Sequence, residues 1–142
     1  MEIRKFTSRD IQPIVELWYH ASVIAHPFIS PAIWESHRQE MAEKYLPQSE
    51  TYVALRDQEI VGFISMVDNY MAALFVKTEL QGQGIGTMLL DFIKKKQHPI
   101  ELRVFQKNRK SVGYYKHSGF SIIGGELEEN TNEPEYLMRW EP

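Results

Sequence analysis

The segment Gln81-Gly82-Gln83-Gly84-Ile85-Gly86-Thr87 separates an apolar stretch, residues 70–77, from an amphipathic stretch, residues 84–97. The first stretch has the length of a buried strand, and the second places apolar side chains on one helical face. Glycines let a backbone turn sharply and approach an anion, and the first turn of a helix offers free amides and a positive dipole end. The segment therefore predicts a turn whose amides hold a pyrophosphate, although such a turn can also serve only to pack a helix against a strand.

The kind of phosphate ligand follows from what the segment lacks. A P-loop requires a lysine after its last glycine, and here Gly86 is followed by Thr87. A dinucleotide-binding turn requires a third glycine where Thr87 stands, although Glu101 lies at a suggestive distance downstream. That turn usually opens its fold, whereas this one follows several predicted elements. Both nucleotide sites are thus disfavoured.

The rest of the chain divides into short, well-punctuated elements. Helices are expected where apolar residues recur at helical spacing, and strands where β-forming runs are bounded by turn residues. The expected strands are 2–6, 51–56, 59–67, 70–77, 99–105, 120–125 and 134–140, and the expected helices are 10–25, 30–46, 84–97 and 108–118. The order β-αα-βββ-α-β-α-ββ predicts a mixed α/β (α+β) domain that spans residues 1–142, with residues 70–77 buried on both faces of its sheet.

Composition excludes several classes of function. The chain has 142 residues and a net charge of -3, without the basic surplus typical of nucleic-acid binding. The absence of cysteine removes disulfides, thiolate metal sites and a cysteine nucleophile, and we expect no metal. No apolar run approaches the roughly 20 residues that span a bilayer, and the amino terminus does not resemble a signal peptide. We therefore expect a cytoplasmic protein that does not bind membranes.

Two signatures give the chain a family resemblance. Gln81-x-x-Gly84-x-Gly86 resembles the Q/R-x-x-G-x-G/A motif of the GNAT superfamily of acetyl-CoA-dependent N-acetyltransferases, and Asn108 to Phe120 resembles its N-x-x-A-x-x-F-Y-x-x-x-G-F motif. The segment Ala25-His26-Pro27-Phe28-Ile29 is similar to small bacterial acetyltransferases of the YiaC type. The resemblance implies a mostly antiparallel seven-stranded sheet flanked by four helices.

The resemblance also implies a co-substrate, acetyl-CoA, and a set of contacts to it. In this superfamily the pantetheine arm lies where the fourth and fifth strands part and pairs with the fourth strand. The residues that match are Leu74, Phe75 and Val76 for the arm, Gln81, Gly82, Gln83, Gly84, Ile85, Gly86 and Thr87 for the pyrophosphate, and Asn108 and Tyr115 near the thioester. Tyr115 is expected to protonate the leaving thiolate; taken from spacing alone, Tyr115 is also a core aromatic and Asn108 a helix cap.

The general base is not evident from the sequence. An amine with a pKa near 10.4 costs roughly 4–5 kcal/mol to keep neutral at pH 7, so its proton needs an acceptor. Many members of the superfamily place a glutamate on the fourth strand, but here Met71-Ala72-Ala73-Leu74 carries no carboxylate. Asp68 and His26 are candidates, and histidine titrates in the right range. His26 is equally compatible with a structural hydrogen bond.

The acceptor is expected between the first two helices and the loop that joins the last two strands. The first side offers aromatic and histidine side chains and the second offers carboxylates: Trp18, His20, His26, Phe28, Trp34 and Tyr45, and Glu126, Glu128, Glu129, Glu133 and Glu135. This composition favours a cationic primary amine, such as a protein lysine, a polyamine or another small amine. We predict direct transfer in a ternary complex by a monomer or homodimer; the alternative is a non-catalytic sensor that binds acyl-CoA.

Overall fold

The structure is a computed structural model that describes residues 1–142, and its centre is one seven-stranded sheet in the order β1-β2-β3-β4-β5-β7-β6. The strands are β1 (Glu2–Lys5), β2 (Glu50–Arg56), β3 (Glu59–Val67), β4 (Tyr70–Val76), β5 (Ile100–Phe105), β6 (Ser121–Leu127) and β7 (Pro134–Trp140). All neighbouring strands are antiparallel except β4 and β5, which are parallel. The predicted fold class is confirmed, and each predicted strand is present within two residues of its expected ends.

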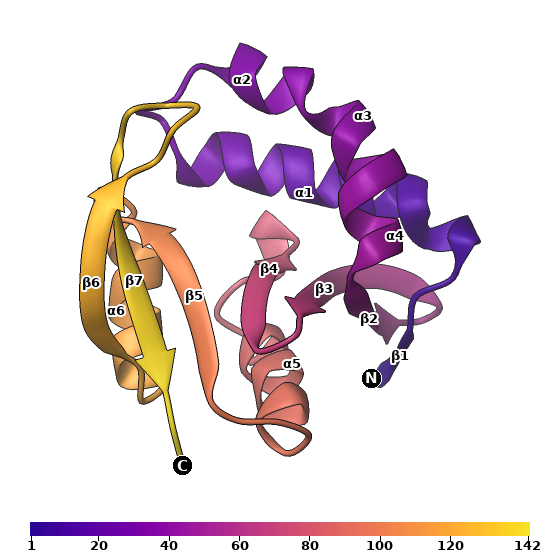
Figure 1. The fold of residues 1–142 in the computed structure, drawn as a ribbon. Coiled ribbons are helices and arrows are strands. Elements are labelled where there is room, and N and C mark those ends of the chain that lie inside the picture. Colours follow the sequence, from indigo (N-terminus) through magenta and orange to yellow (C-terminus); the bar gives the residue numbers. More distant parts are fainter.

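Helices cover both faces of the sheet. The longer ones are α1 (Ile11–Ala25), α5 (Ile85–Lys94) and α6 (Arg109–His117), and the short ones are α2 (Pro31–Ser36), α3 (Arg38–Glu40) and α4 (Leu46–Gln48), with a π turn η2 (Met41–Tyr45) and 3-10 turns η1 (Ser8–Asp10) and η3 (Thr78–Leu80). Figure 1 shows α1 to α4 gathered on one side of the sheet and α5 and α6 on the other. The three long helices agree with the sequence-based prediction.

The predicted single helix 30–46 is wrong in its continuity. The segment is helical from Pro31 to Gln48 but is broken at His37, where φ is -100° and ψ is 0°. The hydroxyl of Ser36 and the Nδ1 atom of His37 both lie 2.7 Å from the carbonyl oxygen of Ile33. These side chains compete with the backbone for that acceptor, which interrupts the helical ladder. Pro47 does not end the segment but lies inside α4.

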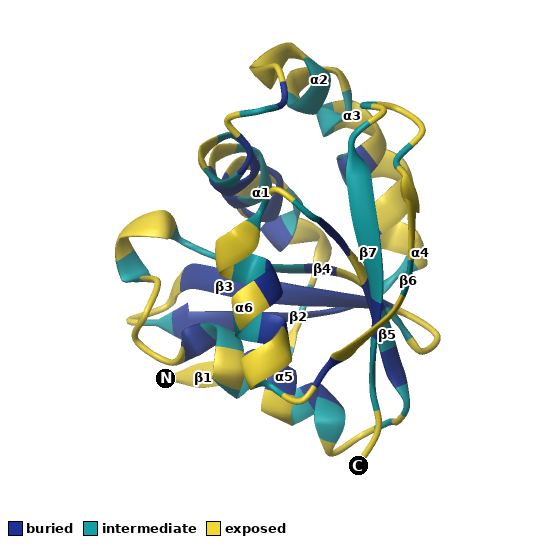
Figure 2. Cartoon of the chain, turned by 90° about the vertical axis from the view of Figure 1, so that its left-hand side faces the viewer, coloured by how far each residue is buried: buried dark blue, intermediate teal, exposed yellow.

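The core consists of two layers, one on each face of the sheet. The larger layer packs α5 and α6 against the strands and contains Leu89, Ile93 and Met138. The smaller layer packs α1, η2 and α4 against β2 and β3 and contains Ile14, Leu46 and Phe63, among others. Figure 2 shows the buried residues concentrated in the strands and on the inner sides of α1 and α5. Both layers hold the strands that border the site in fixed positions.

The sheet opens between β4 and β5. Their only paired residues are Tyr70 and Glu101, at the start of both strands, and the Glu101 amide donates to the Asn69 carbonyl over 2.9 Å. Beyond this point the strands separate, as Figure 1 shows. The prediction that 70–77 is buried on both faces is therefore wrong, because Leu74 to Val76 border an opening and are only half-buried.

Candidate active site

A cleft of about 810 Å³ occupies the opening between β4 and β5. Its walls come from β4, the glycine segment, β5, α6 and the carboxyl end of α1. Those sequence-predicted site residues that line it are His26, Leu74, Phe75, Val76, Gln81, Gly82, Gly84, Ile85, Gly86, Thr87, Asn108 and Tyr115. Gln83 does not line the cleft, because its side chain turns outward and accepts a hydrogen bond from Arg56 over 3.2 Å.

The glycine segment forms a tight turn into α5. Gly82 and Gly84 have φ values of 82° and 88°, a conformation in which a side chain is strained. Gly84 caps α5 without any side-chain hydrogen bond, so the first amides of the helix have no partner within it. A Cβ atom at either glycine would meet nothing within 4 Å, so the turn is open outward. These amides and the helix dipole suit a pyrophosphate group.

Neighbouring side chains hold this turn in place. The Gln81 side-chain amide donates to the Val76 carbonyl over 3.3 Å and accepts from the Lys110 ammonium over 2.9 Å. The hydroxyls of Thr87 and Tyr114 lie 2.9 Å apart. Lys110 therefore brings a positive charge to the turn, a contribution that the sequence reasoning missed although Lys110 lies inside the second signature. Its charge adds to the attraction for an anion.

Asn108 and His26 join the two halves of the cleft. The Asn108 Oδ1 atom accepts from the Ser111 amide over 3.2 Å and so caps α6, as expected for a residue at this position. The Asn108 amide nitrogen lies 3.3 Å from His26 Nε2, and His26 Nδ1 lies 2.7 Å from the Ser22 carbonyl oxygen. Residues 82 positions apart in the chain are thus connected.

These distances fix the proton on His26. A carbonyl oxygen only accepts, so Nδ1 carries the proton and Nε2 is the acceptor. Burial lowers the pKa of His26, although the bond to Ser22 opposes this shift. The ring is packed against Trp34, Phe28 and Phe105 at centroid distances of 5.1, 5.7 and 5.2 Å. The neutral imidazole therefore already uses its single acceptor nitrogen within the protein.

Tyr115 lies in the wall of the cleft, on α6. Its ring makes edge contacts with Tyr114 and Phe120 at 5.5 and 5.7 Å, and the residue is 9% exposed. Burial raises the pKa of its hydroxyl well above the ordinary tyrosine value, and the neighbouring Tyr114 and Tyr70 add to this effect. The phenol stays protonated at neutral pH, and it serves both the core and the cleft.

A second set of polar groups lines the cleft on the side of α1 and α2. Tyr70, Arg103 and Glu135 come from β4, β5 and β7. The Arg103 guanidinium lies 5.5 Å from the centre of the Tyr70 ring, and burial raises the pKa of both Tyr70 and Glu135. Sequence reasoning named Glu135 only as part of an acidic rim and did not find Tyr70 or Arg103.

The other predicted acceptor residues have different positions. Of the aromatic and histidine group, Trp18, His26 and Trp34 line the cleft, and the remaining members do not: His20, Phe28 and Tyr45. Among the carboxylates, only Glu135 lines it; Glu126 and Glu133 form ion pairs with Arg103 and Lys107, Glu128 caps the turn at residues 130–131, and Glu129 is exposed. Asp68 is exposed in the turn between β3 and β4 and does not line the cleft.

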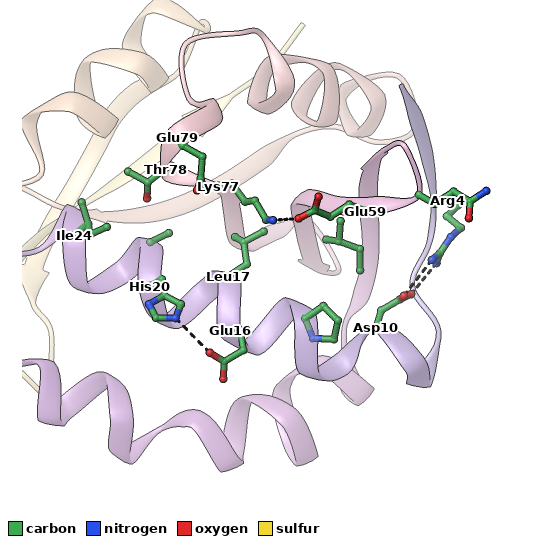
Figure 3. A pocket seen from close by; sticks show the side chains of 14 residues that line it. Arg4, Asp10, Glu16, Leu17, His20, Ile24, Glu59, Lys77, Thr78 and Glu79 are labelled. Atoms are coloured by element: carbon green, nitrogen blue, oxygen red, sulfur yellow. Dashed lines mark hydrogen bonds and ion pairs between the residues drawn. The ribbon is translucent and has the colours of Figure 1, made fainter.

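A second cavity, of about 750 Å³, runs along α1 and shares Ala21, Ile24 and Thr78 with the cleft. Its charged side chains are largely paired with one another, as Figure 3 shows for Lys77 with Glu59 and for Arg4 with Asp10. The paired charges support a structural role for this hollow. The structure contains no cluster of histidine, aspartate or glutamate side chains that could hold a metal ion, and none of its helices meets the length and apolarity needed to cross a bilayer.

A parallel strand pair that parts beside a glycine-rich helix start, with a tyrosine in the wall of the opening, is the arrangement that the family resemblance led us to expect for an acetyl-CoA-dependent transferase. The family model described as acetyltransferase (GNAT) domain matches residues 16–133. The chain belongs to this GNAT family. It is an N-acetyltransferase that uses acetyl-CoA as co-substrate.

Comparisons with individual proteins agree with this family. Peptidyl-lysine N-acetyltransferase YiaC of Escherichia coli K12 is 28% identical over 139 residues, which cover 97% of this chain and 95% of the relative. Peptidyl-lysine N-acetyltransferase YjaB of Salmonella typhimurium is 29% identical over 139 residues, with the same coverage of 97% and 95%.

Solved structures show the same fold. The apo form of YjaB from Escherichia coli superposes with a TM-score of 0.87 at 22% identity, covering 98% of this chain and 96% of that one. The PaiA N-acetyltransferase of Thermoplasma acidophilum, in complex with coenzyme A, superposes with a TM-score of 0.82 at 23% identity, covering 99% and 98%.

Proposed function

We propose that this enzyme acetylates the side-chain amine of lysine residues in proteins, by direct attack of the amine on acetyl-CoA in a ternary complex. The observation that carries the proposal is the single cleft that joins the glycine turn and Tyr115 to a carboxylate, Glu135. A half-buried carboxylate in a cleft that Trp18 and Trp34 also line suits a cation on an apolar stem. Two relatives named as peptidyl-lysine N-acetyltransferases support the same acceptor.

The contacts to acetyl-CoA are proposed residue by residue. The edge of β4 at Leu74 to Val76 pairs with the amides of the pantetheine arm, because these residues line the cleft beyond the last paired residues of β4 and β5. The turn from Gly82 to Thr87 binds the pyrophosphate through its backbone amides, and Lys110 adds a positive charge. A Cβ atom at Gly86 would lie 3.6 Å from its nearest neighbours, which explains how this motif position accommodates glycine or alanine.

Tyr115 is proposed as the group that supplies a proton to the departing thiolate. Its raised pKa keeps the proton on the phenol until the reaction needs it. A thiolate is a weaker base than this phenolate, so it does not remove the Tyr115 proton unaided. Tyr115 therefore gives its proton to the sulfur at the same time as its oxygen receives a proton from the attacking nitrogen. Tyr115 then returns to its protonated state within the same turnover.

His26 is proposed to act through Asn108. Since its acceptor nitrogen faces the Asn108 amide, it fixes the direction of that amide and leaves one N–H of Asn108 for the cofactor arm. The sequence also suggested His26 as a base or substrate contact. The occupied nitrogen and the lowered pKa favour the positioning role.

An acceptor panel tests the proposed function. Release of coenzyme A thiol would be measured with acetyl-CoA and either lysine peptides, peptides that lack lysine, polyamines or no amine. We expect release with lysine peptides and mass-spectrometric acetylation of the lysine side chain. Release only with polyamines would overturn the lysine proposal. If acetyl-CoA raised the melting temperature but no amine caused thiol release, the chain would be an acyl-CoA sensor instead.

Two further properties stay predictions of the sequence. One is a cytoplasmic location, which is to be measured by cell fractionation. The oligomeric state, monomer or homodimer, is to be measured by sedimentation.

A further inference from the structure

Glu135 is the only carboxylate among the residues that line the cleft. Its side chain forms no ion pair and accepts no hydrogen bond, unlike Glu126 and Glu133 on the same hairpin, which are paired with Arg103 and Lys107. The other basic candidate of the cleft, His26, already uses its acceptor nitrogen. One carboxylate with free oxygens therefore faces the space where an amine must lose a proton.

Strand alternation places Glu135 on the acceptor side. On β7, Tyr136, Met138 and Trp140 pack into the core layer beneath α5 and α6. Successive strand residues point to opposite faces, so Glu135 points toward α1 and α2. Its neighbour on β5 is Phe105, whose ring contacts His26 and Trp34 on that same side. Glu135 thus lies opposite the face on which α5 presents its phosphate-binding turn.

We infer that Glu135 is the general base, and that it takes the first proton from the acceptor ammonium. This inference rests on the proposed function and assigns a catalytic residue to it. Glu135 supplies the carboxylate that β4 lacks. It reaches the cleft from β7, which lies on the other side of β5 from β4. The base therefore comes from the last strand of the chain.

The surroundings of Glu135 suit proton transfer. Burial raises the pKa of its carboxyl, Glu128 of the hairpin loop and Glu126 of β6 raise it further, and Arg103 of β5 opposes the shift. Tyr70 of β4 faces the same space. A base whose pKa lies closer to neutrality than that of an ordinary glutamate is a stronger proton acceptor that is still ionised at its working pH.

The reaction balances with two protein groups. Glu135 removes one proton from the ammonium, and the neutral amine attacks the thioester carbonyl carbon to form a C–N bond. As the C–S bond breaks, the nitrogen loses its second proton to the Tyr115 oxygen while the Tyr115 proton passes to the sulfur. The products are the acetylated amine and coenzyme A thiol. Glu135 then releases its proton to solvent, so one proton is released per turnover.

The test compares Glu135→Gln with the wild type between about pH 6 and about pH 10. With a lysine peptide at neutral pH, we expect kcat/KM to fall by about 100-fold or more. The deficit should shrink as the pH approaches the pKa of the amine, because a neutral amine needs no base. An amino-acid amide has an amine with a pKa near 8. With this acceptor, the loss of kcat/KM in Glu135→Gln at neutral pH should be smaller than the loss with the lysine peptide.

Glu101→Gln is the matched control, because Glu101 is a half-buried carboxylate on the neighbouring strand that pairs with Arg139 outside the cleft. We expect its kcat/KM to stay within about threefold of the wild type. Equal melting-temperature shifts of both variants with acetyl-CoA establish that they fold. Wild-type activity of Glu135→Gln, or a deficit that is constant with pH, would overturn the inference. A wild type that acetylates no amine would overturn the proposed function instead.

Discussion

Tyr115 packs in the core, and we have proposed a chemical role for the same residue. Tyr115 belongs to the core layer that packs α5 and α6 against the sheet, and it also lines the cleft. Removing only the hydroxyl separates these roles, because phenylalanine preserves the ring contacts with Tyr114 and Phe120.

We expect Tyr115→Phe to lower kcat by about 100-fold, since the leaving thiolate loses its proton donor. The dissociation constant for acetyl-CoA, measured by calorimetry, should change little. A variant that loses binding and turnover equally would show that the residue is only structural. Tyr19→Phe, on α1 and away from the cleft, is the control for a lost phenol.

The bond between Asn108 and His26 gives a second test at this scale. Because the two residues act as a unit, His26→Phe and Asn108→Ala should be non-additive, with a coupling of about 0.5–3 kcal/mol in unfolding free energy. Asn108→Ala alone should cost about 0.5–2 kcal/mol because α6 loses its cap. The measurement is urea unfolding of both single variants and the double variant; additive effects would contradict the proposed connection.

The position of a site residue could be predicted from the sequence where a local motif marks it. It could not be predicted where it depends on a neighbouring strand. Asn108 and the glycines follow from local spacing, because a cap and a tight turn are local structures. Glu135 does not, because its exposure to the cleft depends on the separation of β4 and β5, which no residue near Glu135 encodes. The hydrogen bond between His26 and Asn108 joins residues that lie far apart in the chain, so no local sequence pattern predicts it either.

At the scale of elements, the two long helices beside the site, α5 and α6, could be predicted because their apolar spacing and glycine boundaries agree. Gly119 ends α6 with a φ of 97°, as expected for a left-handed stop. The break at His37, between α2 and α3, could not be predicted, because it depends on Ser36 and His37 competing for one carbonyl group.

The two kinds of glycine in these helices should respond oppositely to alanine. Gly84 has a φ of 88° and open space around it, so Gly84→Ala adds backbone strain of about 1–2 kcal/mol without a clash. We expect lower stability and a weaker affinity for acetyl-CoA, both measured by thermal unfolding with and without the cofactor. Unchanged affinity would argue against a role of the turn in binding.

Gly113 lies on the exposed side of α6 with ordinary helical geometry. Gly113→Ala should stabilise the protein by about 0.5–1 kcal/mol, because alanine loses less entropy in a helix. Chemical unfolding measures this directly. A destabilised variant would mean that close packing of the helix requires a residue without a side chain at position 113.

At the scale of the whole molecule, one ion pair fixes the amino-terminal strand to α1. Asp10 is buried, accepts two hydrogen bonds from Arg4 over 2.7 and 3.1 Å, and accepts one from the Thr7 amide over 2.7 Å. Arg4 holds the pKa of Asp10 below its usual range. A depressed carboxyl pKa stabilises the folded state above the unfolded pKa, near 3.9, and this contribution is lost as the pH falls through the folded value.

Asp10→Asn should therefore lower the unfolding free energy by about 1–3 kcal/mol at pH 7. The difference from the wild type should begin to shrink below about pH 4, where the carboxyl of the unfolded wild type becomes protonated. It should disappear only at a pH below the depressed pKa of Asp10 in the folded state. Denaturant unfolding at several pH values measures it. Glu40→Gln, an exposed carboxylate of α3, should show no such dependence; an equal difference at every pH would contradict the assignment.

The unpaired edge of β4 lies inside the molecule. An unpaired strand edge usually lies at the rim of a sheet, where it can recruit a foreign chain and start aggregation. β4 instead has its unpaired stretch in the middle of the protein, between walls formed by helices. We expect these walls to admit a slim amide chain without side branches, which can pair with β4. We expect them to exclude a polypeptide strand, whose side chains project from both faces. On this proposal, the unpaired edge of β4 is available to the cofactor arm but not to other proteins.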